Sequence, residues 1–323
     1  MQHMALNEQE IPAPKTFKQQ LWNVAKLVLK IAVTSGLLYW VFTKVDFSKV
    51  KDRLLHANYW WMLVAVICYF CSMLASSWRL LSFFKSIKLK LNPWYNLRLY
   101  FLGLFYNMLL PGGIGGDGYK IFILNKAHKV QGKKLFWAIM FDRLSGLWAI
   151  GLITVGLIFL IPQIDIHIAI PGSIFLAASA VYYFVAYRFF KEYTKFFFQA
   201  HLKALIVQGM QLLAIICVMM GQDFTGKYSP YLLSFLISAL ASILPITVGG
   251  AGAREAIFTK LSDIFPMDKG LAVFLPSSFY LISLLVALFG IYYVIRPARL
   301  EKGLEKSIFE GEPVDENKAA AKN

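Results

Sequence analysis

The sequence has little charge. Only 16% of its 323 residues are Asp, Glu, Lys or Arg, whereas 58% are hydrophobic and the mean hydropathy is +0.57. Soluble domains carry about 25% charged residues, so this composition excludes an ordinary soluble domain and favours a chain dissolved in a bilayer. The net charge of +15 would suggest nucleic acid in a soluble protein. Here the Lys and Arg residues gather in short connections between apolar runs, so we expect no nucleic-acid partner.

Cysteine is also scarce, with three residues in the chain. Cys68 and Cys71 stand inside an apolar run, which excludes the disulfide framework of a small secreted protein. Their C-x-x-C spacing suits zinc or redox chemistry, but the same run has no His and no acid to complete a site. We therefore expect small buried hydrophobes there, no metal and no cofactor.

Catalytic and nucleotide-binding motifs are missing as well. The chain has no G-x-x-x-x-G-K-S/T loop, so direct ATP hydrolysis is not expected. It has no D-x-x-D pair for a metal, and its histidines are expected to be solvated, in loops or at the edges of apolar runs. Four of the five histidines carry this expectation, namely His56, His128, His167 and His201. We accordingly expect no catalytic residue, and a protein that is not an enzyme.

Long apolar runs, by contrast, are abundant. A bilayer core of about 30 Å requires about 20 helical residues. Runs of suitable length are 59–84, 135–161, 168–187, 204–220 and 271–295. A further run, 27–42, contains Lys30 and has no small-residue cleavage site after it, so it predicts an uncleaved first helix and not a signal peptide. The sequence thus predicts an all-α polytopic membrane protein with about six full transmembrane helices.

Two further apolar runs end in helix breakers. Residues 94–110 run into Pro-Gly-Gly-Ile-Gly-Gly, and residues 231–244 run into Pro-Ile-Thr-Val-Gly-Gly. Proline removes an amide donor and paired glycines permit positive φ, so the chain is expected to turn at both places. Irregular backbone inside a membrane must be covered by protein or face a watery cavity. We predict re-entrant hairpins of two half-helices at 94–127 and 231–265. The alternative is a pair of ordinary spans joined by surface loops.

The distribution of Lys and Arg predicts the orientation. Four connections are basic, whereas 162–167 has no Lys or Arg, so the basic ones are expected to face the cytoplasm. Their residues are Lys85, Lys88 and Lys90; Lys126, Lys129, Lys133 and Lys134; Arg188, Lys191, Lys195 and Lys203; and Arg296, Arg299, Lys302 and Lys306. Both termini are then cytoplasmic, and the hairpins enter from opposite sides. One basic loop, around Lys49 and Arg53, disagrees, and Val50, Leu54 and Leu55 predict an interfacial amphipathic helix there.

An internal repeat links the two breaks. With an offset of 134 residues, Pro111 lies over Pro245 and Lys120 over Arg254, and three glycines coincide. The glycine pairs are Gly115 with Gly249, Gly116 with Gly250, and Gly118 with Gly252. The same offset superimposes the neighbouring apolar runs, with repeat 1 at about 59–161 and repeat 2 at about 201–295. Because the hairpins are expected on opposite sides, we predict an inverted repeat, as in many secondary transporters.

Each break precedes a half-helix that could receive an anion. A helix N-terminus has free amides and about half a positive charge, and Lys120 and Arg254 fall in the first turns that follow Gly116 and Gly250. Amides and a cation together would favour a phosphate-bearing group. The alternative is that the glycines only make the turn, while Lys120 and Arg254 snorkel to the interface.

Several other charges lie within apolar sequence. They are Arg79, Arg98, Asp117, Asp142, Arg143 and Glu255. A central Asp or Arg costs about 2.5 to 3.5 kcal/mol on insertion scales, so such side chains are expected to face the bundle interior. Asp142 and Arg143 are adjacent and point about 100° apart on a helix, so each needs another partner. Asp117 and Glu255 are candidates to balance Arg143, Arg79 or Arg254. A structural charge network and a transport path both remain open.

Three segments in combination identify a resemblance. They are Asn107-Met-Leu-Leu-Pro-Gly-Gly-Ile-Gly-Gly-Asp117, Asp142-Arg143-Leu-Ser-Gly146 and Leu244-Pro-Ile-Thr-Val-Gly-Gly-Ala-Gly-Ala-Arg-Glu255. Together they resemble the lysylphosphatidylglycerol synthase transmembrane-region family of flippase-like bacterial membrane proteins, over roughly residues 25–297. The resemblance implies a region that, in the synthases, moves a lysine-modified phospholipid between leaflets. In those proteins a soluble aminoacyl-transfer domain follows this region.

No such soluble domain is expected here, because only some two dozen polar residues follow Arg299. We expect a cytoplasmic segment at 1–24, a flippase-like transmembrane domain at 25–297 and a polar tail at 298–323, in a stand-alone flippase-like protein. Pro276 and Ser277 take the places of Asp142 and Arg143 in the second repeat, so the two halves are not electrostatically equivalent.

The favoured hypothesis is a lipid translocase of the bacterial cytoplasmic (inner) membrane, with a polar path for the anionic headgroup of a phospholipid or lipid-linked substrate. The expected path residues are Arg79, Asn107, Gly115, Gly116, Asp117, Lys120, Asp142, Arg143, Gly249, Gly250, Arg254 and Glu255. The alternatives are an integral-membrane enzyme acting on a phospholipid or polyprenyl carrier, and a non-catalytic assembly subunit. The sequence leaves homo-oligomerisation, the lipid, the direction of transport and its energy coupling open.

Overall fold

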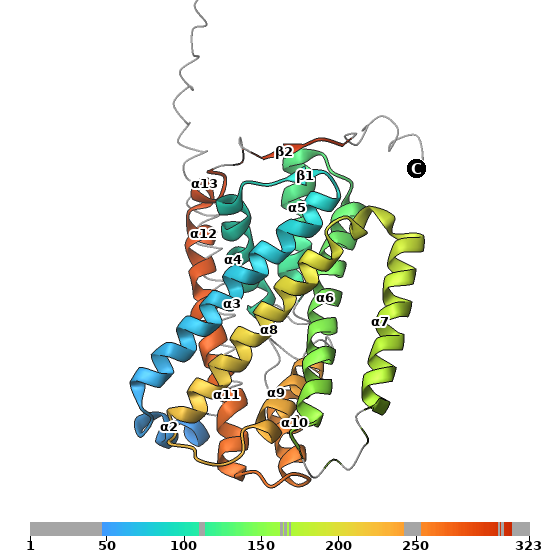
Figure 1. Cartoon of the computed structure of the whole chain (residues 1–323). Coiled ribbons are helices and arrows are strands. Elements are labelled where there is room, and N and C mark those ends of the chain that lie inside the picture. Colours follow the sequence, from blue (N-terminus) through green and yellow to red (C-terminus); the bar gives the residue numbers. More distant parts are fainter. Residues whose placement is uncertain are drawn as a thin grey trace, which may run out of the picture.

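A computed structural model describes residues 47–109, 114–161, 164, 167, 169–241, 253–302, 304 and 307–311. The expected first helix at 27–42 and the glycine-rich segments at 110–113 and 242–252 lie outside the described residues. The described chain is a bundle of α-helices, with one small two-stranded sheet at its upper end (Figure 1).

The long helices match the apolar runs. Five are long and apolar enough to cross a membrane, by length and composition: α3 (Tyr59–Ser86), α6 (Gly132–Ile158), α7 (Ala169–Phe189), α8 (Phe197–Met220) and α11 (Lys269–Ala287), which continues through η2 (Leu288–Gly290) and α12 (Ile291–Ile295). The predicted all-α polytopic membrane protein is confirmed. One boundary was wrong, since α8 begins at Phe197 and not at residue 204.

Shorter helices fill the spaces between the long ones. They are α2 (Phe47–Leu55), α4 (Pro93–Leu109), α5 (Gly115–His128), α9 (Ser229–Ala241), α10 (Ala253–Ser262) and α13 (Pro297–Leu300), with the 3-10 turn η1 (Lys191–Thr194). Strand β1 (Leu89–Lys90) pairs antiparallel with β2 (Ile308–Phe309). The expected amphipathic segment is the helix α2.

The two broken runs form two helical pairs at opposite ends of the bundle. Helix α4 packs against α5 in the upper half of Figure 1, and α9 packs against α10 in the lower half. In the sequence, the segment between the two helices of each pair contains the proline and glycines, and most of that segment lies outside the described residues. Their entry into a bilayer from opposite sides remains a prediction.

The helices of the first repeat, α3 to α6, and of the second repeat, α8 to α11, contact each other in corresponding ways. Helices α3 and α8 lie side by side and run in opposite directions (Figure 1). Helix α6 packs against α8 and α9, and its counterpart α11 packs against α3 and α4. Reciprocal contacts of this kind are the arrangement that an inverted repeat predicts.

Small side chains allow α3 and α8 to approach. Both helices carry buried small residues, Ser76 and Ser82 on α3 and Ala200 and Ala204 on α8. Small residues let helices pack closely in a membrane, where apolar surface by itself gives little preference for another helix over lipid. Polar side chains of α3 contact both neighbouring helices, since Ser82 bonds to Lys203 of α8 and Arg79 bonds to Asp142 of α6.

The helix ends use local capping. The Asn58 side chain accepts a hydrogen bond from the Trp60 amide (3.0 Å) at the start of α3. Asp268 does the same for the Leu271 amide (2.6 Å) at the start of α11, and it also pairs with Arg53 of α2 (2.8 Å). Caps of this kind satisfy amides that have no partner within the helix.

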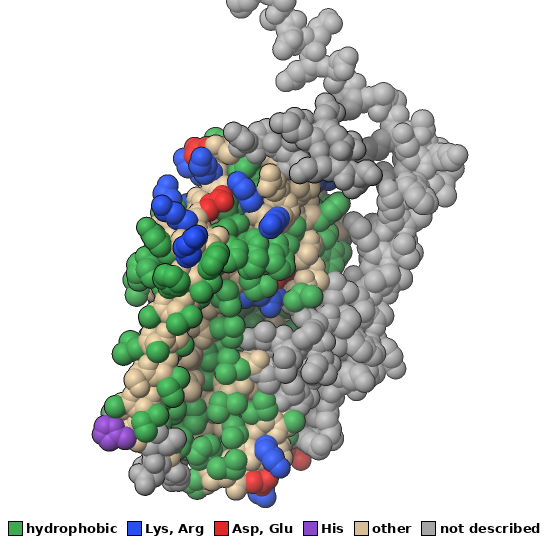
Figure 2. All heavy atoms as spheres, turned by 90° about the vertical axis from the view of Figure 1, so that its right-hand side faces the viewer, with side chains coloured by type: hydrophobic (Ala, Val, Ile, Leu, Met, Phe, Trp, Pro, Cys, Tyr) green, Lys and Arg blue, Asp and Glu red, His purple; other side chains and the backbone are tan. Residues whose placement is uncertain are grey.

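The outer surface is that of a membrane protein. Figure 2 shows hydrophobic side chains over the middle of one face, with most of the visible Lys and Arg toward its upper end and a smaller group at its lower end. Helix α7 lies at the edge of the bundle and buries only Ala186 among its described side chains. Apolar side chains exposed in this way require lipid or another apolar surface around them. The assignment of the upper end to the cytoplasm remains a prediction.

Candidate functional site

A polar cavity of about 130 Å³ lies between α3, α4, α5 and α6. We call this space the polar cavity. It is lined by Arg79, Tyr100, Leu104, Asn107, Asp117, Lys120, Ile139, Asp142 and Arg143. Six of them are predicted path residues: Arg79, Asn107, Asp117, Lys120, Asp142 and Arg143. The structure therefore brings together every charged path residue of the first repeat.

The first charged pair joins α3 to α6. Arg79 Nε donates to Asp142 Oδ1 (2.7 Å) and Arg79 Nη2 donates to Asp142 Oδ2 (3.0 Å), and both residues are buried. Two parallel hydrogen bonds make this the strong form of an ion pair. Gly146, one turn along α6, leaves room for the guanidinium, since a Cβ there would lie 3.3 Å from Arg79 Nη1. The prediction that Asp142 has a partner from another segment is confirmed.

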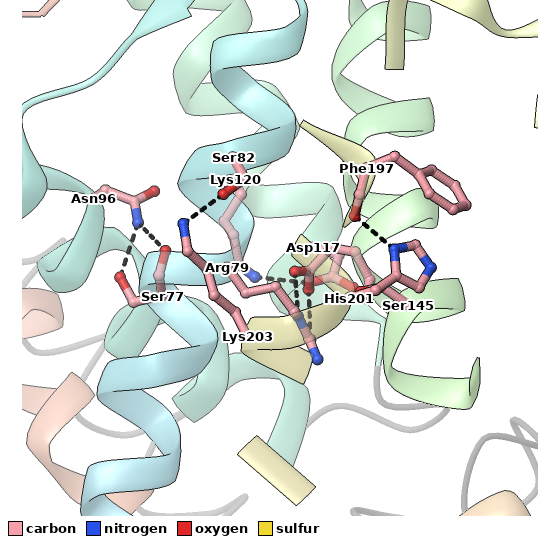
Figure 3. Close-up of polar contacts among 11 residues, drawn as sticks. Ser77, Arg79, Ser82, Asn96, Asp117, Lys120, Ser145, Phe197, His201 and Lys203 are labelled. Carbon is pink, nitrogen blue, oxygen red and sulfur yellow. Dashed lines mark hydrogen bonds and ion pairs between the residues drawn. The ribbon is translucent and has the colours of Figure 1, made fainter. Parts of the chain in front are cut away.

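The second charged group is centred on Asp117 at the start of α5. Its Oδ1 accepts from Lys120 Nζ (2.8 Å) and its Oδ2 accepts from Arg143 Nε (2.7 Å). Arg143 of α6 thus has the predicted partner in Asp117. Figure 3 shows Arg79, Asp117 and Lys120 converging between the helices.

Asn107 connects the end of α4 to the beginning of α5. Its side-chain carbonyl accepts from the Gly116 amide (2.7 Å), and its amide donates to Asp117 Oδ1 (3.4 Å). The backbones of α4 and α5 touch here, because a Cβ on Gly116 would collide with the carbonyl oxygen of Gly103. Gly116 is therefore required for this close approach, which sets the position of Asp117.

The expected cradle of free amides at the start of α5 is wrong. The Gly116 amide already donates to Asn107, and the amides of Asp117 and Gly118 both donate to the Ile114 carbonyl (3.1 Å each). Gly115 begins the helix and is not among the residues that line the polar cavity. Side chains, and not backbone amides, therefore supply the positive charge.

Lys120 does not snorkel to the membrane surface. It is 5% exposed, and its ammonium lies 4.9 Å from the centroid of the Tyr100 ring. Desolvated contacts between an ammonium and an aromatic face are favourable by about 2 kcal/mol. The aromatic ring and Asp117 together hold the Lys120 charge inside the bundle, so the snorkelling alternative is wrong for this residue.

The described lining has an excess of one positive charge. Arg79 and Asp142 neutralise each other, whereas one carboxylate, Asp117, is shared by Lys120 and Arg143. The Arg143 side chain is 33% exposed, compared with 6% for Lys120 and 12% for Asp117. Excess charge in a poorly solvated place favours an anion, and Arg143 is the cation that such an anion would reach first.

The second repeat places its charges differently. The Arg254 guanidinium lies over the rings of Phe235 (5.4 Å) and Phe279 (5.2 Å), and Glu255 Oε1 accepts from the Ser277 hydroxyl (3.2 Å). Neither Arg254 nor Glu255 lines the polar cavity. Gly249 and Gly250 lie outside the described residues, as does the predicted approach of the two glycine-rich tips.

Two expectations about single charges were wrong. Arg98 does not point into the bundle, because its Nη1 donates to the carbonyls of Arg299 (3.1 Å) and Lys302 (2.6 Å) near the chain end. Lys203, expected in a cytoplasmic loop, is 5% exposed within α8 and donates to Ser82 Oγ (2.7 Å). It was misplaced because α8 begins earlier than the apolar run suggested.

His201 was misplaced for the same reason. It is 3% exposed, its Nδ1 lies 2.7 Å from the Phe197 carbonyl oxygen, and its ring is 4.0 Å from that of Phe197. Figure 3 shows this contact. The three consecutive phenylalanines before it could have indicated an earlier helix start. No sequence signal distinguished Tyr100 from its apolar neighbours. In the described part of the chain, no cluster of three His, Cys, Asp or Glu could hold a metal ion.

A comparison with known protein families shows to which family the chain belongs. The family described as the lysylphosphatidylglycerol synthase TM region matches residues 27–205, more than half of the chain. The chain belongs to this family. The matched part includes α3 to α6 and thus the whole polar cavity, but it ends before the second glycine-rich segment. No curated protein matches the chain.

Proposed function

We propose that this member of the lysylphosphatidylglycerol synthase TM region family moves a lipid with an anionic headgroup between the leaflets of a membrane. The single observation that carries the proposal is the excess positive charge of the polar cavity within a membrane-embedded bundle. Buried charges in membrane proteins are costly and commonly mark substrate pathways. A phosphate group would neutralise the excess and thereby lower the cost of burying it.

The arrangement around Asp117 suits reversible binding. An entering phosphate would compete with Asp117 for Arg143, the most exposed of the three cations. It would therefore gain one strong contact without meeting three uncompensated charges. Transport requires binding that permits both entry and release, and a carboxylate that takes Arg143 back after release meets that requirement.

The size of the polar cavity favours a small headgroup. The polar cavity of about 130 Å³ is much smaller than the pockets of about 300 to 1,000 Å³ that hold drug-sized ligands, so it suits a group of the size of a phosphate. The acyl chains then remain in the bilayer while the headgroup passes between α4, α5 and α6. The substrate is a phospholipid or a lipid-linked group, and the protein acts in a bacterial cytoplasmic membrane with both termini inside.

The test is lipid exchange in vesicles. Purified protein is reconstituted with a fluorescently labelled anionic phospholipid, and a membrane-impermeant quencher reports the fraction in each leaflet. We expect exchange well above that of empty vesicles, and a loss of about tenfold in Arg143→Gln, since hydrogen bonds to charged groups contribute about 1.5 kcal/mol or more. Arg53→Gln is the matched control, because Arg53 forms a surface pair with Asp268 outside the polar cavity.

The alternatives predict other results in the same experiment. Mass spectrometry of the recovered lipid should find it chemically unchanged, whereas a new lipid mass would establish the membrane-enzyme alternative. Exchange equal to that of empty vesicles would contradict the proposal. Normal exchange in Arg143→Gln with a lowered unfolding temperature would make the charges a structural network.

A further inference from the structure

A second recess lies on the outside of the bundle, between α3 and α4. This apolar groove has a volume of about 460 Å³, and its lining includes Phe70, Leu74, Trp78, Leu81, Trp94 and Leu97. The α3 members lie on one side of that helix and extend along it for about 16 Å. Trp78 and Trp94 are 52% and 68% exposed, so the groove faces the surroundings of the bundle.

The groove is separate from the polar cavity. The Asn96 side-chain amide of α4 donates to the carbonyl (2.9 Å) and hydroxyl (2.8 Å) oxygens of Ser77 of α3. Both residues are buried, and Figure 3 shows these contacts between the two helices. This link closes the seam between α3 and α4, so that a ligand in the groove would lie outside the path proposed for headgroups.

One buried cation lies beside the groove. The Lys203 ammonium donates to Ser82 Oγ (2.7 Å) and lies 4.1 Å from the centroid of the Trp78 ring, which lines the groove. Its residue is 5% exposed, and among the described residues no carboxylate forms an ion pair with it. An ammonium has three donors, and an unpaired charge in an apolar place is costly. An anion from outside the described residues would lower the cost of burying the Lys203 charge.

A second lysine extends the positive charge along the same side of α3. Lys85 is exposed and lies seven residues, about two helical turns, beyond Trp78. It stands near the end of α3 at Ser86, where the connections at this end are basic. The groove is thus apolar along its length and positively charged at one end, and tryptophans accompany the charged end, as is usual at the level of lipid headgroups.

We propose that this groove binds an anionic phospholipid, with one acyl chain along α3 and the phosphate between Lys85 and Lys203. The charge complements a phosphate, and the chain complements the apolar lining. This lipid stays on the outer face of the bundle and is distinct from a transported one. The proposal stands independently of translocation, because it requires neither the polar cavity nor movement of the headgroup.

The first test compares two lipids with identical chains. Purified protein in neutral detergent is titrated with phosphatidylglycerol or phosphatidylcholine, and binding is followed by native mass spectrometry. We expect tighter binding of the anionic lipid, and about fivefold weaker binding in both Lys85→Gln and Lys203→Gln, because one basic residue near a lipid surface contributes about that factor. Phosphatidylcholine binding should be unaltered. Lys126→Gln is the control, an exposed lysine of α5 that does not line the groove.

Equal affinity for the two lipids, or no effect of Lys85→Gln, would overturn the proposal. The exposed Lys85 keeps the test decisive if the buried Lys203→Gln variant does not fold. Leu74→Trp fills the groove while leaving both lysines in place, so it should weaken both lipids about equally.

The second test identifies the occupant directly. A photoreactive amino acid at position 74, which is 37% exposed in the groove, is activated in native membranes. A covalent adduct with the mass of an anionic phospholipid supports the proposal. A crosslink to residues 1–46 of the same chain, or to a second copy, would instead identify a protein segment as the occupant and overturn it.

Discussion

The starts of α5 and α10 occupy equivalent places in the two halves, yet they stabilise their cations in different ways. Lys120 pairs with Asp117 beside a cavity that also contains Arg143, whereas Arg254 lies against the rings of Phe235 and Phe279. An ion pair with a shared carboxylate can exchange partners with an entering anion. A guanidinium over aromatic rings is held by packing as well as by charge. Equivalent position therefore does not imply equivalent chemistry.

The largest expected effect comes from the buried ion pair of Arg79 with Asp142 in the first half. Asp142→Asn leaves the Arg79 guanidinium buried without its carboxylate, and breaking such a pair costs about 3 to 5 kcal/mol of stability. Thermal unfolding in detergent measures it. The double variant Arg79→Met with Asp142→Leu should recover most of the loss, since neither charge is then left alone. A loss below about 1 kcal/mol in Asp142→Asn would mean that Arg79 reaches another anion or water.

A smaller effect is expected where α4 and α5 touch. In Gly116→Ala the new Cβ meets the Gly103 carbonyl, and overpacking of this kind costs about 1 to 3 kcal/mol. The displaced α5 should also move Asp117 and lower lipid exchange. The control is Gly118→Ala, because a Cβ at that position meets no atom within 4 Å. If the two variants unfold at the same temperature, the close approach of α4 and α5 is not needed.

The two cations give the direct test of the comparison. Lys120→Gln removes the excess charge of the polar cavity and should lower exchange of an anionic lipid about tenfold. Arg254→Gln should cost about 0.5 to 2 kcal/mol of stability through its ring contacts and change exchange by no more than about twofold. Vesicle exchange and thermal unfolding are measured on both. Equal losses of exchange would show that both halves contact the headgroup.

The smallest effect concerns Glu255. Ser277→Ala removes the hydroxyl that donates to Glu255 Oε1, which should cost about 1 kcal/mol and leave lipid exchange unaltered. Unfolding temperature is the measurement, with Ser283→Ala of the same helix as the control, since its hydroxyl donates to the Tyr280 carbonyl. A marked loss of exchange in Ser277→Ala would bring Glu255 into the transport path.

Much of the cavity could be predicted because burial of charge is costly. Asp142 and Arg143 required partners, and Asp117 was the acid nearest a break in the chain. The pairing of Arg79 with Asp142 could not be predicted, since it depends on how α3 packs against α6. The start of α8 could not be predicted from the apolar run either. Lys203 and His201 are polar, yet both lie inside this helix and are buried by its neighbours.

The sequence by itself determined the membrane solvent, the five described spans and the two breaks, because each follows from local properties: run length, apolar content, and the restrictions of proline and glycine. It also predicted the burial of Arg79, Asp117 and Asp142, but it wrongly included Arg98 and missed Lys203. Only the tertiary structure decided that Lys120 and Arg143 share Asp117, that the first amides of α5 are already bonded, and that Lys203 lies beside an apolar groove. These outcomes depend on side chains distant in the chain meeting at packed interfaces, where their positions determine which charges pair with one another.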